Sequence, residues 1–192
     1  MKLVPTASQT VGPFFHVGLA RPELADLTRG GKAQGQTIII EGQVRDGDGA
    51  PVPDALLEIW QANAAGKYAH PEDTQAKATD PNFVGFGRVF TDKEGCYRFR
   101  TIKPGAVPGR GNALQAPHIA MTVFARGLLK HLATRIYFAD LAQANEADPV
   151  LSAIEDEAAR HTLIARPVNG APVAYRFDVV LQGEGETQFF DV

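Results

Sequence analysis

The chain has 192 residues, a formal net charge of -3 at neutral pH and 44% apolar residues. This apolar content can fill the core of one domain, since all-β sandwiches often reach this size as a single unit. The basic residues are scattered singly along a slightly acidic chain, which argues against a nucleic-acid partner because such proteins carry a clustered positive surface.

No segment of the sequence indicates secretion or membrane insertion. The first ten residues, MKLVPTASQT, contain one lysine and no continuous apolar run. The apolar runs elsewhere fall far short of the ~18 residues that a membrane span needs. We therefore expect a cytoplasmic protein with no membrane partner. The single cysteine, Cys96 in GCYRFR, has no second cysteine to pair with and is expected to be a small, buried, unreactive strand residue.

The first predicted elements in the chain are two strands joined by a turn. The apolar runs TIIIEGQVRD and DALLEIWQA lie on either side of GDGAPVP. The residues at 46–49 are aspartates and glycines, which tolerate positive φ, so this pattern predicts a β-hairpin. Later strand candidates are short and rich in Val, Ile, Phe and Tyr. They lie at 87–90, 96–102, 118–125, 134–138, 162–166 and 174–182.

These strands predict a mainly β fold, a two-layer antiparallel β-sandwich with long loops and one or two short helices. We expect one domain over residues 1–192, with residues 1–36 as an N-terminal arm and loop. One helix is predicted from Asp148 as N-cap and Pro149 at the first helical position, with apolar residues at helical spacing through Ala158. The long irregular stretches are expected to carry a site or a partner surface, and they lie at 17–36, 62–85 and 104–117.

Several motifs, in order along nearly the whole chain, resemble those of the intradiol aromatic-ring dioxygenases. They are TASQTVGPFFHVGLA, EIWQANAAGKYAH, DPNFVGFGR, TDKEGCYRFRTIKPG, APHIAMTVFARG, TRIYFAD and AYRFDVVLQGEGETQFFDV. In that family the catalytic chain holds a mononuclear ferric ion with two tyrosines and a His-x-His pair on a strand. Residues two positions apart on a strand point to the same face, so both histidine rings of the pair can reach one metal ion. The positive charge of the metal stabilises each tyrosine as a phenolate.

The match is incomplete at the metal-binding positions. Tyr68 in GKYAH falls at the first ligating tyrosine and His118 in PHIAM at the first histidine. Val107 replaces the second tyrosine and Ala120 the second histidine, and neither side chain has a donor atom. Losing two ligands should prevent metal binding, so we expect no metal in this chain and a vestigial pocket at these positions.

The resemblance implies that Fe(III) belongs to a homologous, iron-bearing partner chain, which would cleave a carboxylated catechol with O2 in a hetero-oligomer. This chain would contribute to the partner's substrate pocket through an N-terminal arm, Thr10, Gly12 and Pro13, and through Arg135 in TRIYF. The guanidinium can pair bidentately with an anionic substrate.

Alternatives remain open at four points. Phe14 and Phe15 either extend the arm toward a partner or anchor it on this chain's own sandwich, and Arg135 is equally consistent with an ordinary surface strand position. A metal site would exist only if other residues, such as His70 or Tyr97, replaced the two missing ligands. A rival function is a metal-free binding or interaction module of sandwich fold with no part in ring cleavage.

Overall fold

The computed structural model describes residues 3–168 and 171–191, and strands dominate them. The strands are β1 (Thr37–Arg45), β2 (Leu56–Trp60), β3 (Phe86–Phe90), β4 (Cys96–Ile102), β5 (Val107–Pro108), β6 (Leu114–Gln115), β7 (Ile119–Phe124), β8 (Leu132–Phe138), β9 (Ile164–Val168), β10 (Ala171–Arg176) and β11 (Val179–Val180). The mainly β fold predicted from the sequence is confirmed.

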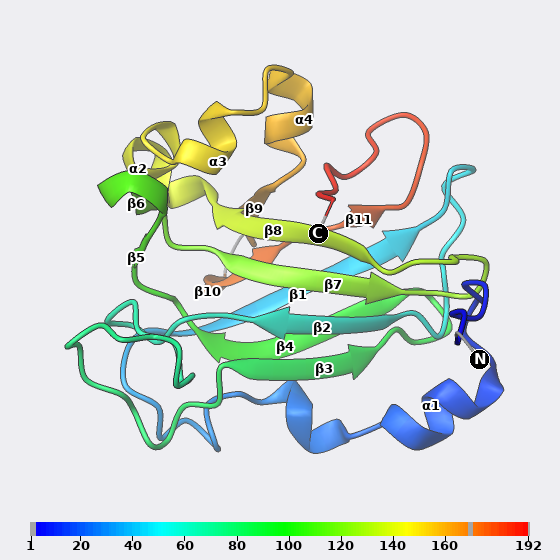
Figure 1. The fold of residues 1–192 in the computed structure, drawn as a ribbon, viewed down its shortest axis with the longest axis horizontal. Helices are drawn as coiled ribbons and strands as arrows, with labels where there is room; N and C mark the ends of the chain where they lie inside the picture. The colour runs from blue at the N-terminus through cyan, green and yellow to red at the C-terminus, as the bar shows by residue number, and fades with distance from the viewer. Residues whose placement is uncertain (1–2, 169–170, 192) are drawn as a thin grey trace.

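The strands form two facing layers (Figure 1). In the first layer β3, β2, β7 and β8 pair antiparallel in that order. In the second layer β4 pairs antiparallel with β1, which runs parallel to β10 and β11, and β10 pairs antiparallel with β9. Parallel pairing of β8 with β9 connects the two layers, so that their strands form one continuous hydrogen-bonded sheet. The sheet is therefore mixed, with parallel pairs that the antiparallel prediction did not contain.

Strict alternation of side chains explains why the two layers face each other. In β1, Ile38 and Ile40 are fully buried while their neighbours are half-buried. In β7, Ile119, Met121 and Val123 are likewise buried and join the same hydrophobic core. Because successive side chains point to opposite faces, the remaining positions of β7, which include Ala120, lie on the outer face of the first layer.

The predicted hairpin between β1 and β2 is wrong, although its turn is present. The carboxylate of Asp46 accepts hydrogen bonds from the amides of Asp48 and Ala50 at 3.0 and 2.9 Å, and Arg45 bridges Pro51. Pro51 and Pro53 lack the amide protons that a strand ladder needs. The chain therefore leaves β1 after the turn, and β2 pairs with β3 and β7 in the other layer.

The helices are more numerous and shorter than predicted. They are α1 (Pro13–Leu19), α2 (Ala142–Glu146), α3 (Pro149–Ser152) and α4 (Glu157–His161), with 3-10 helices at Pro22–Ala25, Arg110–Asn112 and Ala139–Leu141. Asp148 caps α3 as predicted, but the helix does not continue to Ala158, because Asp156 caps a new helix at the amide of Ala158. Among the described residues, every helix falls short of the length and apolarity that a membrane crossing requires. The cytoplasmic location stays a prediction.

Cys96 is exposed, so its predicted burial is wrong. Cys96, Arg98 and Arg100 alternate with the buried Tyr97 and Phe99 along β4, which places the thiol on the solvent side of the second layer. A period-two pattern fixes which residues share a face but not which face is covered.

Candidate functional site

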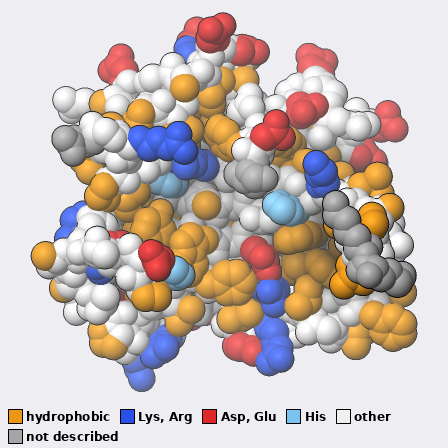
Figure 2. Space-filling view, viewed as in Figure 1, with side chains coloured by type: hydrophobic (Ala, Val, Ile, Leu, Met, Phe, Trp, Pro, Cys, Tyr) orange, Lys and Arg blue, Asp and Glu red, His pale blue; other side chains and the backbone are white. Residues whose placement is uncertain are grey.

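The candidate site lies on the outer face of the first layer, where β2, β7 and β8 run side by side. Trp60 pairs with Ala120, and Ala120 pairs with Arg135, so these three residues form a row across the strands. The next row contains His118 and Tyr137, whose ring centroids are 5.6 Å apart. In Figure 2, hydrophobic side chains gather in the middle of this face among scattered charges of both signs.

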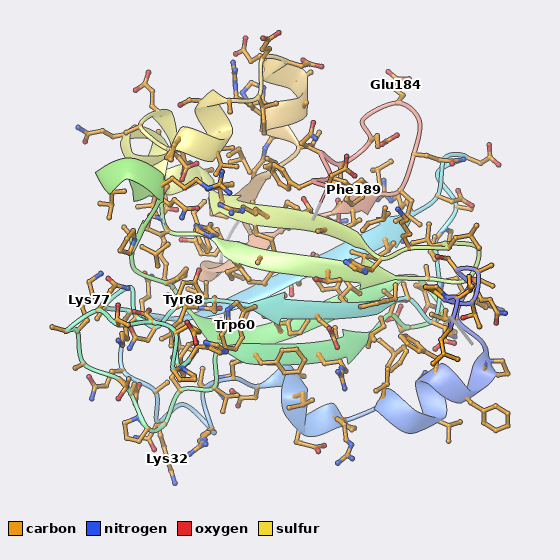
Figure 3. The ribbon with its side chains drawn as sticks, in the orientation of Figure 1. Lys32, Trp60, Tyr68, Lys77, Glu184 and Phe189 are labelled. Atoms are coloured by element: carbon orange, nitrogen blue, oxygen red, sulfur yellow. The ribbon has the colours of Figure 1, made fainter. Side chains whose placement is uncertain are left out.

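Tyr68 reaches this face from the long loop between β2 and β3. Its ring stacks on Trp60, with centroids 5.9 Å apart and an interplanar angle of 11°. Figure 3 shows the two labelled side chains together at one end of the sheet. The stacking brings the predicted tyrosine over the row that contains Ala120.

A buried ion pair holds the loop that carries Tyr68. The carboxylate of Asp73 accepts from the amides of Tyr68 and Gln75 at 2.8 and 3.0 Å, and it lies 3.3 Å from the ammonium of Lys67. Burial alone would raise the pKa of Asp73, but these donors lower it to about 2. The loop is therefore fixed by a carboxylate that stays ionised, and Tyr68 is positioned by its own backbone.

Val107 completes the set of four predicted positions. It pairs with Gln115 in the short ribbon of β5 and β6, and it lines a cleft of about 610 Å³ together with Tyr68 and Trp60. The structure thus brings Tyr68 and Val107 to one cleft, beside the strand positions of His118 and Ala120. Tyr68 and Val107 come from separate motifs of the sequence, and the fold brings these two residues to one cleft.

The donor atoms left in this pocket do not fit the four-ligand set that the resemblance implies. Tyr68 keeps its hydroxyl, and burial raises the pKa of that group. The Nδ1 of His118 is 2.8 Å from the carbonyl oxygen of Ala116, so with Nδ1 protonated only Nε2 is free to bind a ligand. Val107 and Ala120 contribute no donor. Across residues 3–168 and 171–191, no three His, Cys, Asp or Glu side chains cluster as a metal site.

The two displaced-ligand candidates do not complete the set. The hydroxyl of Tyr97 donates to the carbonyl oxygen of Phe177 at 2.5 Å in the second layer, and burial raises the pKa of this tyrosine well above its usual value. His70 lines the Tyr68 cleft, but its Nδ1 is 3.2 Å from the amide of Glu72 and accepts that hydrogen bond. Neither residue replaces Val107 or Ala120.

Arg135 lies within this group rather than on an open surface. Its Nη1 donates to Oε1 of Gln115 at 2.6 Å and lies 3.4 Å from the hydroxyl of Tyr137. The Tyr137 hydroxyl in turn donates to the buried carboxylate of Asp148 at 3.2 Å. Sequence reasoning named Arg135 but missed Gln115, Tyr137 and Asp148, because only the strand register and the short β5–β6 ribbon bring them to it.

The N-terminal arm lies at the other end of β7. The hydroxyl of Thr10 accepts a hydrogen bond from the amide of Gly127 at 2.7 Å. Phe15 packs against Phe124 and Phe90, with ring centroids 5.6 and 6.5 Å apart, whereas Phe14 is 84% exposed. Of the two alternatives for the arm, anchoring on the sandwich therefore holds for Phe15.

The arm and Arg135 are not brought together within one chain. Gly12 and Pro13 begin α1, while Arg135 pairs with Ala120 near the start of β7. Four strand residues, or about 13 Å, separate Ala120 from Phe124 beside the arm. A partner's substrate pocket would therefore have to reach both ends of this face, or different copies of the chain would supply the two groups.

Comparisons with known proteins agree with the geometry. A family model described as "Dioxygenase" matches residues 11–183. The protocatechuate 3,4-dioxygenase alpha chain of Pseudomonas putida is 44% identical over 100% of this chain and 98% of its own length. The beta chain of that enzyme from Burkholderia cepacia is 40% identical over 94% of this chain and 77% of its own length. The solved dioxygenase domain of a carbohydrate-binding fusion from Streptomyces sp. SirexAA-E superposes with a TM-score of 0.59 and 26% identity, over 83% of this chain and 87% of that one.

Proposed function

The chain belongs to the intradiol dioxygenase family, and from this membership we propose that it is the iron-free alpha subunit of a protocatechuate 3,4-dioxygenase. The complete enzyme would insert both atoms of O2 between the two hydroxylated ring carbons of protocatechuate. The product is 3-carboxy-cis,cis-muconate, an intermediate of the β-ketoadipate pathway of aromatic catabolism.

One observation carries the non-catalytic assignment. Tyr68 and Val107 line one cleft, and two of the four positions that the family match assigns to a metal, Val107 and Ala120, have no donor atom. The chemistry is therefore assigned to a beta chain, which would hold the ferric ion, and that ion would supply activation of the catechol toward O2. Residues 1–192 act as one domain in this proposal.

The partner is a homologous chain, and two features of this chain support pairing. A beta-chain relative is itself 40% identical to this sequence, so the two kinds of chain share a family. Phe14 and Val17 of α1 are 84% and 76% exposed, which leaves apolar area that pairing can cover.

Within the complex this chain shapes the pocket instead of performing the chemistry. We assign the arm residues Thr10, Gly12 and Pro13 to the wall of the partner's pocket. Arg135 provides a guanidinium for the substrate's carboxylate, because its Nη1 uses only neutral acceptors and leaves its remaining donors for an anion. This chain then helps to orient the anionic ring at the partner's site, and proton and electron transfers belong to the beta chain.

Co-expression with the beta chain tests the assignment. We expect each chain alone to be inactive on protocatechuate, and the purified complex to turn it over with about one iron per alpha-beta pair. Iron content and ring-cleaving turnover in the isolated alpha chain would overturn the non-catalytic assignment. Failure of the two chains to form an active complex would instead favour a metal-free interaction module. The ultraviolet absorbance change on ring opening measures turnover, and elemental analysis measures iron.

A further inference from the structure

Arg135 lies beside the two lost ligand positions of its own chain, in a cleft next to the one that Tyr68 and Val107 line. It is the direct cross-strand neighbour of Ala120, which stands at a lost ligand position. Its Nη1 donates to Gln115, which is the strand partner of Val107, the other lost position. The guanidinium is thus tied to the surroundings of both missing donors.

The two donors that remain also lie near this guanidinium. Tyr68 stacks on Trp60 at the far end of the row that contains Ala120 and Arg135. His118 faces Tyr137, whose hydroxyl is 3.4 Å from Nη1 of Arg135. Tyr68 therefore contacts a residue of the row that contains Arg135, and His118 contacts a side chain within 3.4 Å of the guanidinium.

This cation is permanent and is held in place by a hydrogen-bonded network. A guanidinium stays protonated throughout the accessible pH range, so it cannot release its proton to make room for a metal as a lysine or a histidine can. The Tyr137 hydroxyl links Arg135 to the carboxylate of Asp148, whose side chain is fully buried. Asp148 also accepts from the amides of Ala116, Val150 and Leu151. A hydrogen-bonded network therefore holds the guanidinium in place through the Tyr137 hydroxyl.

We propose that Arg135 is a built-in cation that excludes metal from this chain, so that the loss of donors at Val107 and Ala120 is one of two separate barriers. A metal ion placed among these residues would meet a fixed like charge in a partly buried site, where solvent screens it poorly. The proposal concerns this chain's own pocket and does not depend on the proposed function of the complex.

The test restores the donors with and without the cation. In the co-expressed complex we compare Val107→Tyr/Ala120→His with the same pair plus Arg135→Gln and with the same pair plus Arg135→Lys. Glutamine keeps a hydrogen-bonding group without charge, and lysine keeps the charge. We expect the metal content to stay at that of the wild-type complex for the double and lysine variants. It should rise by nearly one iron per pair, with a phenolate-to-iron absorption band, for the glutamine variant.

A smaller change keeps the proposal testable if these variants fold poorly. Ala120→His alone places a second imidazole two residues after His118, at the start of β7, and Zn2+ titration by calorimetry then compares it with Ala120→His/Arg135→Gln in the full chain. We expect removal of the arginine to tighten Zn2+ binding at least tenfold. Equal affinities, or a second iron in the complex that retains Arg135, would overturn the proposal. A wild-type complex without iron would refute the proposed function and leave the Zn2+ comparison unaffected.

Discussion

Nothing in the packing of this chain requires a glycine at position 12. Its φ of -104° suits any amino acid, and a Cβ built on it would meet no atom within 4 Å. Gly18, in the same helix α1, has equally open surroundings. A requirement for glycine at position 12 would therefore come from a partner that approaches the backbone closely.

We predict that Gly12→Ala leaves the unfolding of the isolated chain unchanged but lowers kcat/KM of the complex roughly tenfold or more, because small misplacements at a substrate pocket are costly. Gly18→Ala is the matched control and should retain full activity. Steady-state turnover of protocatechuate measures both variants. Equal activity of the two variants would remove Gly12 from the pocket.

Arg135 offers a second prediction at this scale. Arg135→Ala should raise KM for the carboxylated substrate roughly tenfold, since hydrogen bonds to charged groups contribute about 1.5–3 kcal/mol each. Arg110 lines the same cleft as Arg135 but is exposed, so Arg110→Ala should change KM less than about twofold. A KM that is unchanged by Arg135→Ala, with unchanged kcat, would confine this residue to its own chain's pocket.

At the scale of elements, the loop over residues 62–85 determines where Tyr68 lies. The loop has little regular structure, and the pair of Lys67 and Asp73 supports it from within, with side chains 9% and 8% exposed. A buried carboxylate with several donors is stable only while it is ionised. The position of Tyr68 is therefore linked to the protonation state of Asp73.

This link predicts an acid sensitivity with a defined sign. The pKa of Asp73 is about 2 in the folded chain against its ordinary 3.8, so its contribution to stability is fully present above about pH 4 and is lost as the pH falls toward 2. The free energy of unfolding of wild type minus that of Asp73→Asn should therefore shrink between pH 4 and pH 2.5. Denaturant titrations at several pH values measure this difference. A difference that is constant over that range would contradict the assignment.

The elements that sequence patterns predicted well are those with a strong local cause. β4 was predicted at its observed bounds because apolar and polar residues alternate along it, and the cap of α3 followed from the Asp148-Pro149 pair. The pairing of β1 failed because two prolines send the chain to the other layer, which is a tertiary effect. The contacts of Arg135 with Gln115 and Tyr137 depend on the register between strands that are distant in sequence, so no local sequence pattern predicts them.

At the scale of the whole molecule, the N-terminal arm divides its aromatic pair between two environments. Phe15 packs on Phe90 and Phe124 of the first layer, whereas Phe14 points away from these contacts and is 84% exposed. An apolar ring exposed to water is stabilised when a partner covers it. Phe15 should therefore contribute to the stability of the isolated chain, and Phe14 to the stability of the complex.

Phe14→Ala should weaken the alpha-beta complex by about 2 kcal/mol, or roughly thirtyfold in Kd, because the ring is buried only when the partner binds. It should leave the unfolding of the isolated chain unchanged. Phe15→Ala should instead destabilise the isolated chain, lowering its free energy of unfolding by about 1–3 kcal/mol because the ring contacts are lost. Sedimentation velocity measures the Kd, and denaturant unfolding measures the chain. If Phe14→Ala destabilised the isolated chain as much as Phe15→Ala does, the arm would be an internal element of this chain and its exposed face would need no partner.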